Sequence, residues 1–393
     1  MADIDIRHGD CLTVLRDLSD NSVDSVVTDP PYGLSNTTPP QVADVLAAWV
    51  TGDTEAVPTK RGGFMGKDWD SFVPPPAVWA ECLRVLKPGG HLAVFAGART
   101  QDLMGLSIRL AGFEIRDTLG WVYGSGFPKS MDVSKAIGKN TGEGREWDGW
   151  GTALKPAIEP IILARKPLDG TVAANVLAHG VGGLNIDASR VPTEDKLGGG
   201  HSTNGQQMQD GWHRPWMDDP EAVAANAARS RESVAKSEAL GRFPANVLLD
   251  EHAAAEMDRQ SGDSVSRKGT PRRSQSPGDG YGMTHTGAEY NDQGGASRFF
   301  PVFKYQAKAP KKERPVIVRE DGTKIAHPTV KPVALMEWLV TLITPEGGTT
   351  LDPFAGTGTT LQAARDGGFA AIGIEQDKDY IALIEQRLST LQF

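Results

Sequence analysis

The sequence predicts an α/β protein with a mostly parallel sheet, helices on both faces and a long insertion. Stretches with strand periodicity alternate with stretches with helix periodicity over residues 3–184 and again over 325–393. The chain has 393 residues, of which 39% are hydrophobic, so it can form two or three domains or one large domain with an insertion. The 45 glycines and 26 prolines predict many loops. A small disulfide-stapled module is excluded.

The first part of the chain, residues 1–184, begins with a β-α-β unit. We expect a strand at 4–6, a helix at about 11–18 and a strand at 23–28 that runs into a turn with two prolines. The sequence Lys-Pro-Gly-Gly at 87–90 is expected to stop a helix. The helices and strands that continue the alternation are expected at 76–86, 91–95, 100–111, 113–123 and 158–164.

The middle part, residues 185–324, has a different composition, rich in Gly, Ser, Asn, Gln and Arg up to about residue 297. The stretches 197–205 and 264–282 show no apolar period and predict loops, whereas the apolar strips 243–249 and 299–303 indicate some packing. In residues 325–393 the alternation resumes. Its elements are expected to be a helix to 343, a strand at 349–351, a helix to 366, a strand at 370–374 and a helix at 378–388.

The composition excludes several classes of protein. Cys11 and Cys82 are far apart and no histidines cluster, so neither a disulfide framework nor a zinc site is expected. The first residues are charged and no run of about 18 apolar residues occurs, so we expect a cytoplasmic protein without a membrane span. The net charge of −9 argues against a polyanionic partner unless the charge is unevenly distributed.

The last β-α-β unit has the pattern of a nucleoside site. A strand runs into Asp352, a Gly-x-Gly turn opens a helix, and the next strand ends 23 residues later at Glu375. Small residues let the backbone approach a ligand, and an acid at the end of the second strand can accept hydrogen bonds from both ribose hydroxyls. A turn whose glycines serve only packing is the alternative. The loop consists of Asp352, Pro353, Phe354, Ala355, Gly356, Thr357, Gly358 and Thr359.

Leu361 indicates which nucleoside is bound. A dinucleotide site has Gly or Ala at this position to make room for a pyrophosphate, so Leu361 disfavours an NAD-dependent oxidoreductase. S-adenosylmethionine has no phosphate, and Asp352 would then accept a hydrogen bond from its ammonium group. No metal is expected, because a sulfonium is already an activated methyl donor.

Asp29, Pro30, Pro31 and Tyr32 follow a buried strand and suit the methylation of an exocyclic amine. The lone pair of such an amine is delocalised into the ring, so two acceptors must draw the nitrogen toward tetrahedral geometry. The Asp29 carboxylate and the Pro30 carbonyl can accept its two N–H bonds while Tyr32 stacks on the base. The prolines fix φ and hold the carbonyl in place. A stiff turn with an Asp cap is the alternative.

These motifs together resemble those of the amino-group DNA methyltransferases, which methylate N6 of adenine or N4 of cytosine. The catalytic tetrapeptide comes first, then His-Pro-Thr-x-Lys-Pro at 327–332, and the cofactor loop last, which is similar to the β order of motifs. The segments 62–69 and 155–160 resemble those of phage-type members, which implies a bacterial or phage-infected cell. The resemblance implies a circularly permuted, Rossmann-like S-adenosylmethionine-dependent fold with a seven-stranded sheet. It also implies a catalytic part at 1–184, a target-recognition insertion at 185–324 and a cofactor part at 325–393.

The resemblance also implies roles for residues outside the two main motifs. Asp10 and Cys11 would lie at the adenine of the cofactor, although Asp10 also suits a helix N-cap. Thr329 and Lys331 would line the methionine end of the cofactor pocket.

Other residues are expected at the DNA. Trp121 and Tyr123 would contact the flipped base, with a place in the core as the alternative. The loop 62–69, with Lys67, would close over the base or be a disordered surface loop, and a structural role is expected for Glu159.

The charge is unevenly distributed along the chain. Residues 190–330 carry 20 Lys and Arg against 19 Asp and Glu, so the acidity belongs to the flanks. Within 190–330, basic residues form clusters that could bind the phosphates of a DNA backbone. The predicted DNA contacts are Arg267, Lys268, Arg272, Arg273, Lys311 and Lys312.

The sequence therefore predicts a site-specific methyltransferase that acts on N6 of adenine in double-stranded DNA after base flipping. Asp29 favours adenine, since the family tends to have Ser at this position for cytosine. N4-cytosine methylation is the first alternative. An RNA or protein-amide methyltransferase and an inactive DNA-binding module are less favoured, and a homodimer is compatible with the sequence.

Overall fold

The computed structural model describes residues 3–35, 37–58, 70–124, 126, 128, 130–141, 144–193, 218–265, 293–303, 315–319, 321–322, 324–327 and 329–389. The chain divides into two compact units. The first comprises Met1–Asn185, Asn246–Ala253 and Val302–Phe393, and the second Ile186–Ala245 and Ala254–Pro301. Parts of the expected insertion thus belong to the first unit.

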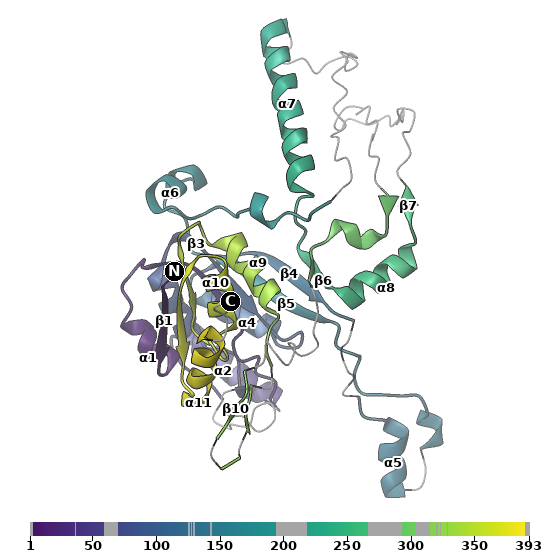
Figure 1. Cartoon of the computed structure of the whole chain (residues 1–393). Helices are drawn as coiled ribbons and strands as arrows, with labels where there is room; N and C mark the ends of the chain where they lie inside the picture. The colour runs from purple at the N-terminus through teal and green to yellow at the C-terminus, as the bar shows by residue number, and fades with distance from the viewer. Residues whose placement is uncertain are drawn as a thin grey trace. The chain divides into compact units, whose positions relative to one another are not determined.

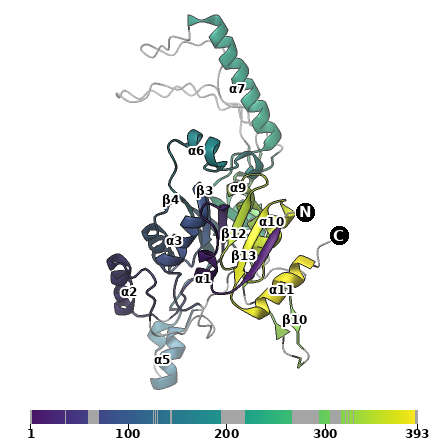
Figure 2. The ribbon, with the colours of Figure 1, turned by 90° about the vertical axis from the view of Figure 1, so that its left-hand side faces the viewer.

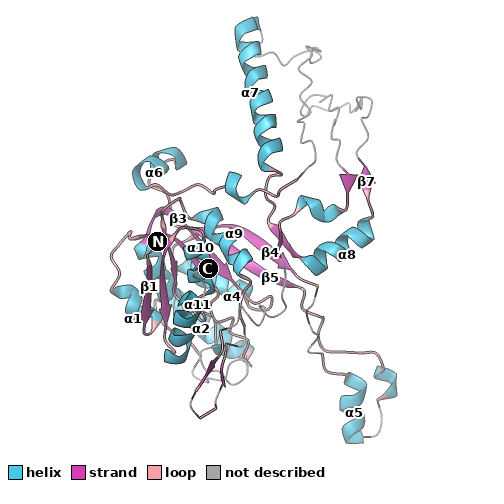
Figure 3. Cartoon of the chain, viewed as in Figure 1, coloured by secondary structure: helices cyan, strands magenta, loops and turns pink. Residues whose placement is uncertain are grey.

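The first unit is built on a nine-stranded sheet with helices on both faces, as the sequence predicts (Figure 1, Figure 3). Neighbouring strands run parallel except at β3–β5 and β5–β4. The strands, in spatial order, are β1 (Ile4–His8), β13 (Ala370–Glu375), β12 (Thr349–Asp352), β2 (Val23–Thr28), β3 (Leu86–Phe95), β5 (Ile158–Arg165), β4 (Glu114–Val122), β6 (Val247–Asp250) and β9 (Val302–Phe303).

The strand number differs from the seven expected because two short strands of the middle part join the sheet. β6 pairs in parallel with β4, and β9 pairs in parallel with β6. The apolar strips at 243–249 and 299–303 therefore contribute, in part, to the main sheet rather than to a separate core. The fold class, a mostly parallel sheet of Rossmann-like type, is confirmed.

Two hydrophobic clusters cover the two faces of the sheet, and alternate residues of β5 divide between them. Ile162 and Ala164 pack on one face, whereas Ile161 and Leu163 pack on the other. The first face is covered by α1 (Cys11–Arg16), α2 (Pro39–Thr51), α3 (Pro76–Val85) and α4 (Gln101–Leu110). The second is covered by α9 (Val333–Ile343), α10 (Thr359–Asp366) and α11 (Lys378–Ser389), as Figure 2 shows for α10 and α11.

Two elements of the first unit differ from the expectation. No element is predicted from the pattern at 39–51, but Thr38 and Gln41 form a capping box, two prolines begin α2, and Gly52 ends it with a φ of 108°. The residues 87–90 stop α3 as predicted but already belong to β3. The strand tolerates them because its pairing with β2 is irregular there and Gly89 adopts a left-handed φ of 78°.

The remaining elements are peripheral to the sheet or belong to the second unit. None of the described helices is both long and apolar enough to span a membrane. Most of the stretches 197–205 and 264–282, where loops are predicted, lie outside the described residues. The elements are α5 (Val133–Thr141), η3 (Arg145–Trp147), α6 (Val172–His179), η4 (Asp187–Ser189), α7 (Pro220–Leu240), α8 (Glu251–Ser261), β7 (Ser264–Val265), β8 (Gln293–Gly294), η6 (Ala296–Phe299), β10 (Ile317–Val318) and β11 (Lys324–Ile325).

Candidate active site

The Asp-Pro-Pro-Tyr turn and the glycine-rich loop lie at the carboxyl ends of adjacent parallel strands, β2 and β12. Ligands of open α/β sheets bind at this edge. The hydroxyl of Thr28, the last residue of β2, donates a 2.7 Å hydrogen bond to Oδ1 of Asp352. Asp29, the next residue, is therefore held beside the start of the predicted cofactor loop.

Asp70 holds the backbone of the turn, a role that the sequence did not reveal. Its Oδ1 accepts hydrogen bonds from the backbone N–H groups of Tyr32 and Gly33, at 2.8 and 3.0 Å. The Thr100 hydroxyl donates to the Tyr32 carbonyl at 2.6 Å. Asp70 is buried, so these bonds are shielded from water and fix the direction in which the turn leaves the sheet.

Lys331 lies at the catalytic turn. Its Nζ is 2.6 Å from Oδ2 of Asp29, 2.9 Å from the Tyr32 hydroxyl and 3.3 Å from Oε2 of Glu159. The Tyr32 hydroxyl is also 2.9 Å from Oδ1 of Asp29 and 3.2 Å from Oε2 of Glu159. The ammonium thus binds the Asp29 carboxylate, and a contact of Lys331 with the methionine end of the cofactor stays a prediction.

Burial and charge act in opposite directions on Lys331. Burial alone would lower the pKa of Lys331, but the carboxylates of Asp29 and Glu159 raise it by more, so the pKa lies above its usual range. The ring centroids of Phe95 and Tyr32 lie 4.6 and 5.3 Å from Nζ and add cation–π attraction. Lys331 is therefore a permanent cation at the site.

Glu159 reaches the turn from β5, although the sequence gave it only a structural role. Its side chain shares a sheet face with Ile161, because strand residues two apart point to the same side. This is the face that α9 covers, and Lys331 precedes α9. A charged residue at the inward-facing start of an apolar strand was the available signal for this role.

Asp352 supports the glycine-rich loop from within. Its Oδ1 accepts from Thr28 and from the N–H of Phe354, and its Oδ2 accepts from the Thr360 hydroxyl at 2.6 Å. Burial raises the pKa of Asp352 to about 6, although these hydrogen bonds partly oppose the shift. The contacts give Asp352 a structural function, and its binding of a ligand ammonium stays a prediction.

The two glycines of the loop have different reasons to be glycine. Both adopt left-handed φ values, 54° at Gly356 and 74° at Gly358. A Cβ at Gly358 would lie 2.9 Å from Cγ2 of Ile384, so this glycine also lets α11 pack closely. A Cβ at Gly356 would lie 3.8 Å from Nε2 of His327, an ordinary van der Waals distance, so only the left-handed φ requires glycine there.

Glu375 ends β13 and binds the loop. Its Oε2 accepts from the Gly356 N–H and its Oε1 from the Asp377 N–H, both at 2.8 Å. Burial raises the pKa of Glu375 to about 7, although the backbone hydrogen bonds partly oppose the shift. The carboxylate thus lies between the loop and the end of its strand, where the sequence predicts a ribose acceptor.

Asp10 and Cys11 lie at the start of α1, after β1, the neighbour of β13 in the sheet. Asp10 is the N-cap of α1 and accepts from the Thr13 N–H at 3.0 Å. Its side chain is exposed, so the cap leaves it accessible. Burial raises the pKa of Cys11 to about 12, which makes the thiol inert.

The residues at this edge fit an adenosine without phosphates. Asp10, Asp352 and Glu375 bring three carboxyl groups to the ends of β1, β12 and β13, and these would repel a pyrophosphate. Gly356, which has no side chain, lies next to the Glu375 carboxylate that accepts a hydrogen bond from its N–H. The chemistry of this set agrees with S-adenosylmethionine.

The remaining loop residues and Thr329 shape this edge. The Ala355 N–H donates to the Ile374 carbonyl, the Phe354 ring packs against Trp79, and Thr357 accepts from Arg387. The Thr329 N–H donates to Nδ1 of His327, whose ring packs edge-on against Tyr380 at 4.8 Å. A contact of Thr329, Pro353 or Thr359 with the cofactor stays a prediction.

Trp121 and Tyr123 lie in the hydrophobic core. They are 4% and 8% exposed, and their ring centroids are 5.5 Å apart. They pack with Phe95 and Leu248 on the face of the sheet that α9 covers. Neither side chain is open to a flipped base in this conformation, because both rings are buried in the hydrophobic cluster on that face of the sheet.

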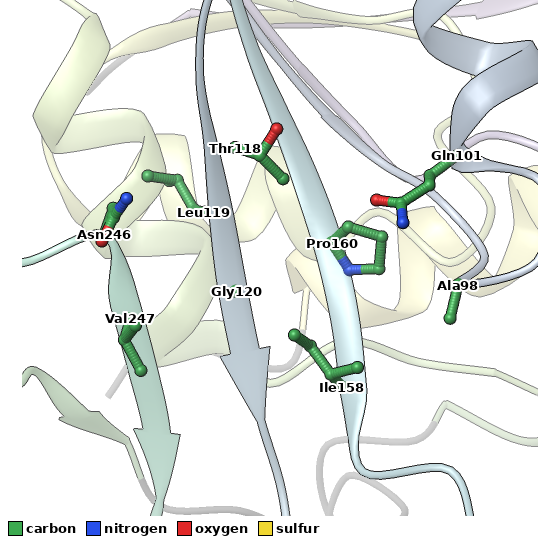
Figure 4. Close-up of a pocket in the computed structure, with 9 residues that line it drawn as sticks. All are labelled: Ala98, Gln101, Thr118, Leu119, Gly120, Ile158, Pro160, Asn246 and Val247. Carbon is green, nitrogen blue, oxygen red and sulfur yellow. The ribbon is translucent and has the colours of Figure 1, made fainter.

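A separate pocket of about 230 Å³ opens over β4, β5 and β6 (Figure 4). Ile158 and Pro160 line it, so it lies on the opposite face of β5 from Glu159. No residue of the candidate site lines it. Its other lining residues are Ala98, Gln101, Thr118, Leu119, Gly120, Asn246 and Val247.

The predicted DNA contacts of the basic clusters are not among the described residues. They are Lys67 with the loop 62–69, Arg267, Lys268, Arg272, Arg273, Lys311 and Lys312. In the part of the chain that the structure describes, no group of three or more His, Cys, Asp and Glu residues could hold a metal ion.

A family model for DNA methylases of the N6/N4 type matches residues 23–386. The chain belongs to this family. The match covers both the catalytic turn and the cofactor loop, and it supports S-adenosylmethionine as the cofactor, as the sequence predicts.

Curated relatives include two bacterial type II methyltransferases. M.HindIII of Haemophilus influenzae is 27% identical over an alignment of 203 residues. The alignment covers 46% of this chain and 64% of that protein. M2.DpnII of Streptococcus pneumoniae is 44% identical over 62 residues, which are 16% and 23% of the two chains. The match thus spans less than two thirds of the length of either relative.

Two solved structures are similar at low scores. The M1.HpyAVI–SAM complex is 15% identical with a TM-score of 0.41, and the match covers 98% of each chain. The PvuII DNA methyltransferase, which is cytosine-N4-specific, is 14% identical with a TM-score of 0.45, over 100% of this chain and 89% of that one.

Proposed function

We propose that this protein transfers a methyl group from S-adenosylmethionine to the N6 amino group of adenine in double-stranded DNA. One observation carries the proposal: the hydrogen bond from Thr28 to Asp352 joins the strand that presents Asp29 to the strand that opens the glycine-rich loop. An amine bound at Asp29 and a cofactor bound at that loop are therefore neighbours, as direct transfer requires.

The catalytic turn orients the amine. S-adenosylmethionine would supply a methyl on its sulfonium: the N6 lone pair would form the new C–N bond as the C–S bond breaks, the neutral thioether would leave, and the surplus N6 proton would pass to water. The Asp29 carboxylate and the Pro30 carbonyl accept the two N–H bonds of the amine, so that the lone pair points at the methyl. Pro31 keeps the turn rigid, and Tyr32 stacks on the base. The target base must leave the duplex to reach this turn.

The glycine-rich loop and its neighbours hold the cofactor. Glu375 accepts the ribose hydroxyls, Asp10 lies near the adenine amino group, and Gly356 gives the ligand close access to the backbone. The three contacts come from β13, the start of α1 and the loop after β12. Family membership supports this cofactor, and the placement of these residues at one sheet edge supports their roles.

Replacing Asp29 tests the proposal. Asp29→Ala and Asp29→Asn should reduce methylation of unmethylated genomic DNA by at least about 100-fold, because the amine loses its charged acceptor. Binding of S-adenosylmethionine, measured by calorimetry, should change by less than about twofold. Asp5→Asn, which removes a carboxylate on β1, is the control and should keep full activity. An Asp29→Ala variant that still methylates DNA at the normal rate would refute the assignment.

The choice between adenine and cytosine is tested on the product. The methylated DNA is digested to nucleosides, and mass spectrometry should detect N6-methyl-2′-deoxyadenosine. N4-methylcytosine instead would show that the pocket takes the other exocyclic amine. The aspartate at position 29 supports adenine, on the family tendency toward serine for cytosine.

A further inference from the structure

Two hydrogen-bond donors at the catalytic turn are each shared by two carboxylates. The Lys331 ammonium lies 2.6 Å from Oδ2 of Asp29 and 3.3 Å from Oε2 of Glu159. The Tyr32 hydroxyl lies 2.9 Å from Oδ1 of Asp29 and 3.2 Å from the same Oε2 of Glu159. A tyrosine hydroxyl has one hydrogen, so it donates to one carboxylate at a time. The hydroxyl therefore has two arrangements, whereas the ammonium, with three hydrogens, can shift the balance of its hydrogen bonds between the two carboxylates.

In the arrangement with the shorter distances, two donors already engage Asp29, although each of its oxygens keeps a lone pair. Each of its two oxygens already accepts a bond, one from Tyr32 and one from Lys331. The ammonium also offsets the negative charge that makes a carboxylate a strong acceptor. An amine that needs Asp29 as its acceptor must compete with both donors.

We infer that Glu159 is a positioning residue that takes over the Lys331 ammonium and the Tyr32 hydroxyl when the target amine arrives, and so releases Asp29 to accept the amine. The inference rests on the proposed function. The exchange needs movements of tenths of an ångström, since each donor already lies close to both acceptors. No covalent bond changes, and both donors keep their protons.

The protonation of the two donors agrees with this exchange. Burial and the carboxylates of Asp29 and Glu159 raise the pKa of Tyr32 well above its usual range, so its hydroxyl stays protonated. Lys331 stays cationic between two anions and the rings of Phe95 and Tyr32. One cation between two carboxylates leaves a net negative charge on the group. The carboxylate that is less engaged by the cation can then accept a hydrogen bond from the target amine.

The position of Glu159 leaves its carboxylate available for the exchange. Its side chain is 24% exposed, the same as that of Asp29, whereas the Lys331 side chain is 9% exposed. Pro160 follows Glu159 in β5. The residue that pairs with Glu159 on the neighbouring strand β4 is Trp121, a core residue. Glu159 therefore lies at the rim of the core, with its carboxylate partly open to solvent.

A double-mutant cycle in methylation tests the consequence. Glu159→Gln should slow single-turnover methylation of genomic DNA about 10- to 100-fold at saturating cofactor, because Lys331 then stays on Asp29. Cofactor and DNA affinity should change less than about twofold. In a Lys331→Met background the same replacement should change the rate less than about threefold, since no ammonium has to leave Asp29. Glu114→Gln, which removes the partner of Arg165 on the same strand pair, is the control for loss of an ion pair.

Two results of this cycle would overturn the inference. One is an unchanged methylation rate in Glu159→Gln. The other is an equal slowing by Glu159→Gln with and without Lys331→Met, which would show that Glu159 acts independently of the ammonium. Wild-type protein that leaves no methyl group on DNA would instead refute the proposed function.

A measurement without methylation tests the sharing itself. In protein with ¹⁵N-labelled lysine, the Lys331 ammonium resonance is assigned by its loss in Lys331→Met. Asp29→Asn and Glu159→Gln should each shift this resonance, because both carboxylates contact Nζ. A resonance that moves with Asp29→Asn but not with Glu159→Gln would overturn the inference, whether or not the protein methylates DNA.

Discussion

The ionisation of Glu375 should make cofactor binding depend on pH near neutrality. Burial raises the pKa of this carboxyl group from 4.5 to about 7 in the protein without ligand. A carboxylate accepts both ribose hydroxyls, whereas a carboxylic acid must donate at one oxygen. Binding of S-adenosylmethionine should therefore strengthen as the pH rises through about 7 and level off above it.

The size of the effect follows from this pKa. With a pKa of about 7, roughly ten in eleven of the groups are protonated at pH 6 and about one in eleven at pH 8. If only the ionised form binds, the dissociation constant at pH 6 is about tenfold larger than at pH 8. A group with its ordinary pKa would change the affinity by only a few per cent over this range.

Calorimetric titration with S-adenosylmethionine between pH 5.5 and 8.5 measures this dependence. Glu375→Gln is the matched control, because it keeps the shape of the side chain but has no proton to lose. The variant should bind weakly with a flatter profile, in which the titrations of Asp352 near pH 6 and of the ligand amino group near pH 8 remain. Wild-type affinity that is constant from pH 6 to 8, or a Gln variant with the same slope, would refute the role of Glu375.

Two further predictions concern stability and DNA binding. Gly358→Ala should lower the free energy of unfolding in urea by about 1–3 kcal/mol, because the left-handed φ is unfavourable for alanine and the new Cβ meets Ile384. Gly347→Ala is the control: Gly347 has a similar φ but open space around it, so this variant should lose less free energy of unfolding. Equal losses in the two variants would contradict the steric argument. Charge reversal of Lys311 and Lys312 should weaken DNA binding in fluorescence anisotropy and reduce its salt dependence by about two counterions, with cofactor affinity unchanged; unchanged DNA affinity would contradict a backbone contact there.

Local patterns in the sequence were sufficient for the main architecture. The period of the apolar residues predicted the two β-α-β units, and the structure forms both, with β2 entering the Asp-Pro-Pro-Tyr turn and β12 entering the glycine-rich loop. α2 was missed even though its capping box and its two prolines are visible in the sequence. Such elements depend on residues only a few positions apart, so the sequence contains the information that defines them.

The organisation of the catalytic turn was decided by the tertiary structure. Lys331 is 302 residues from Asp29 along the chain, and Glu159 reaches Tyr32 across 127 residues. Trp121, predicted at the base, is in the core because its side chain packs into the hydrophobic cluster on one face of the sheet. Periodicity determines which side of a strand a residue occupies, but distances of about 3 Å between distant side chains depend on how the strands are ordered and how α9 packs on them. The sequence thus determined which side chains can accept or donate hydrogen bonds. The packing of the sheet and its helices determined that the Lys331 ammonium contacts the carboxylates of both Asp29 and Glu159.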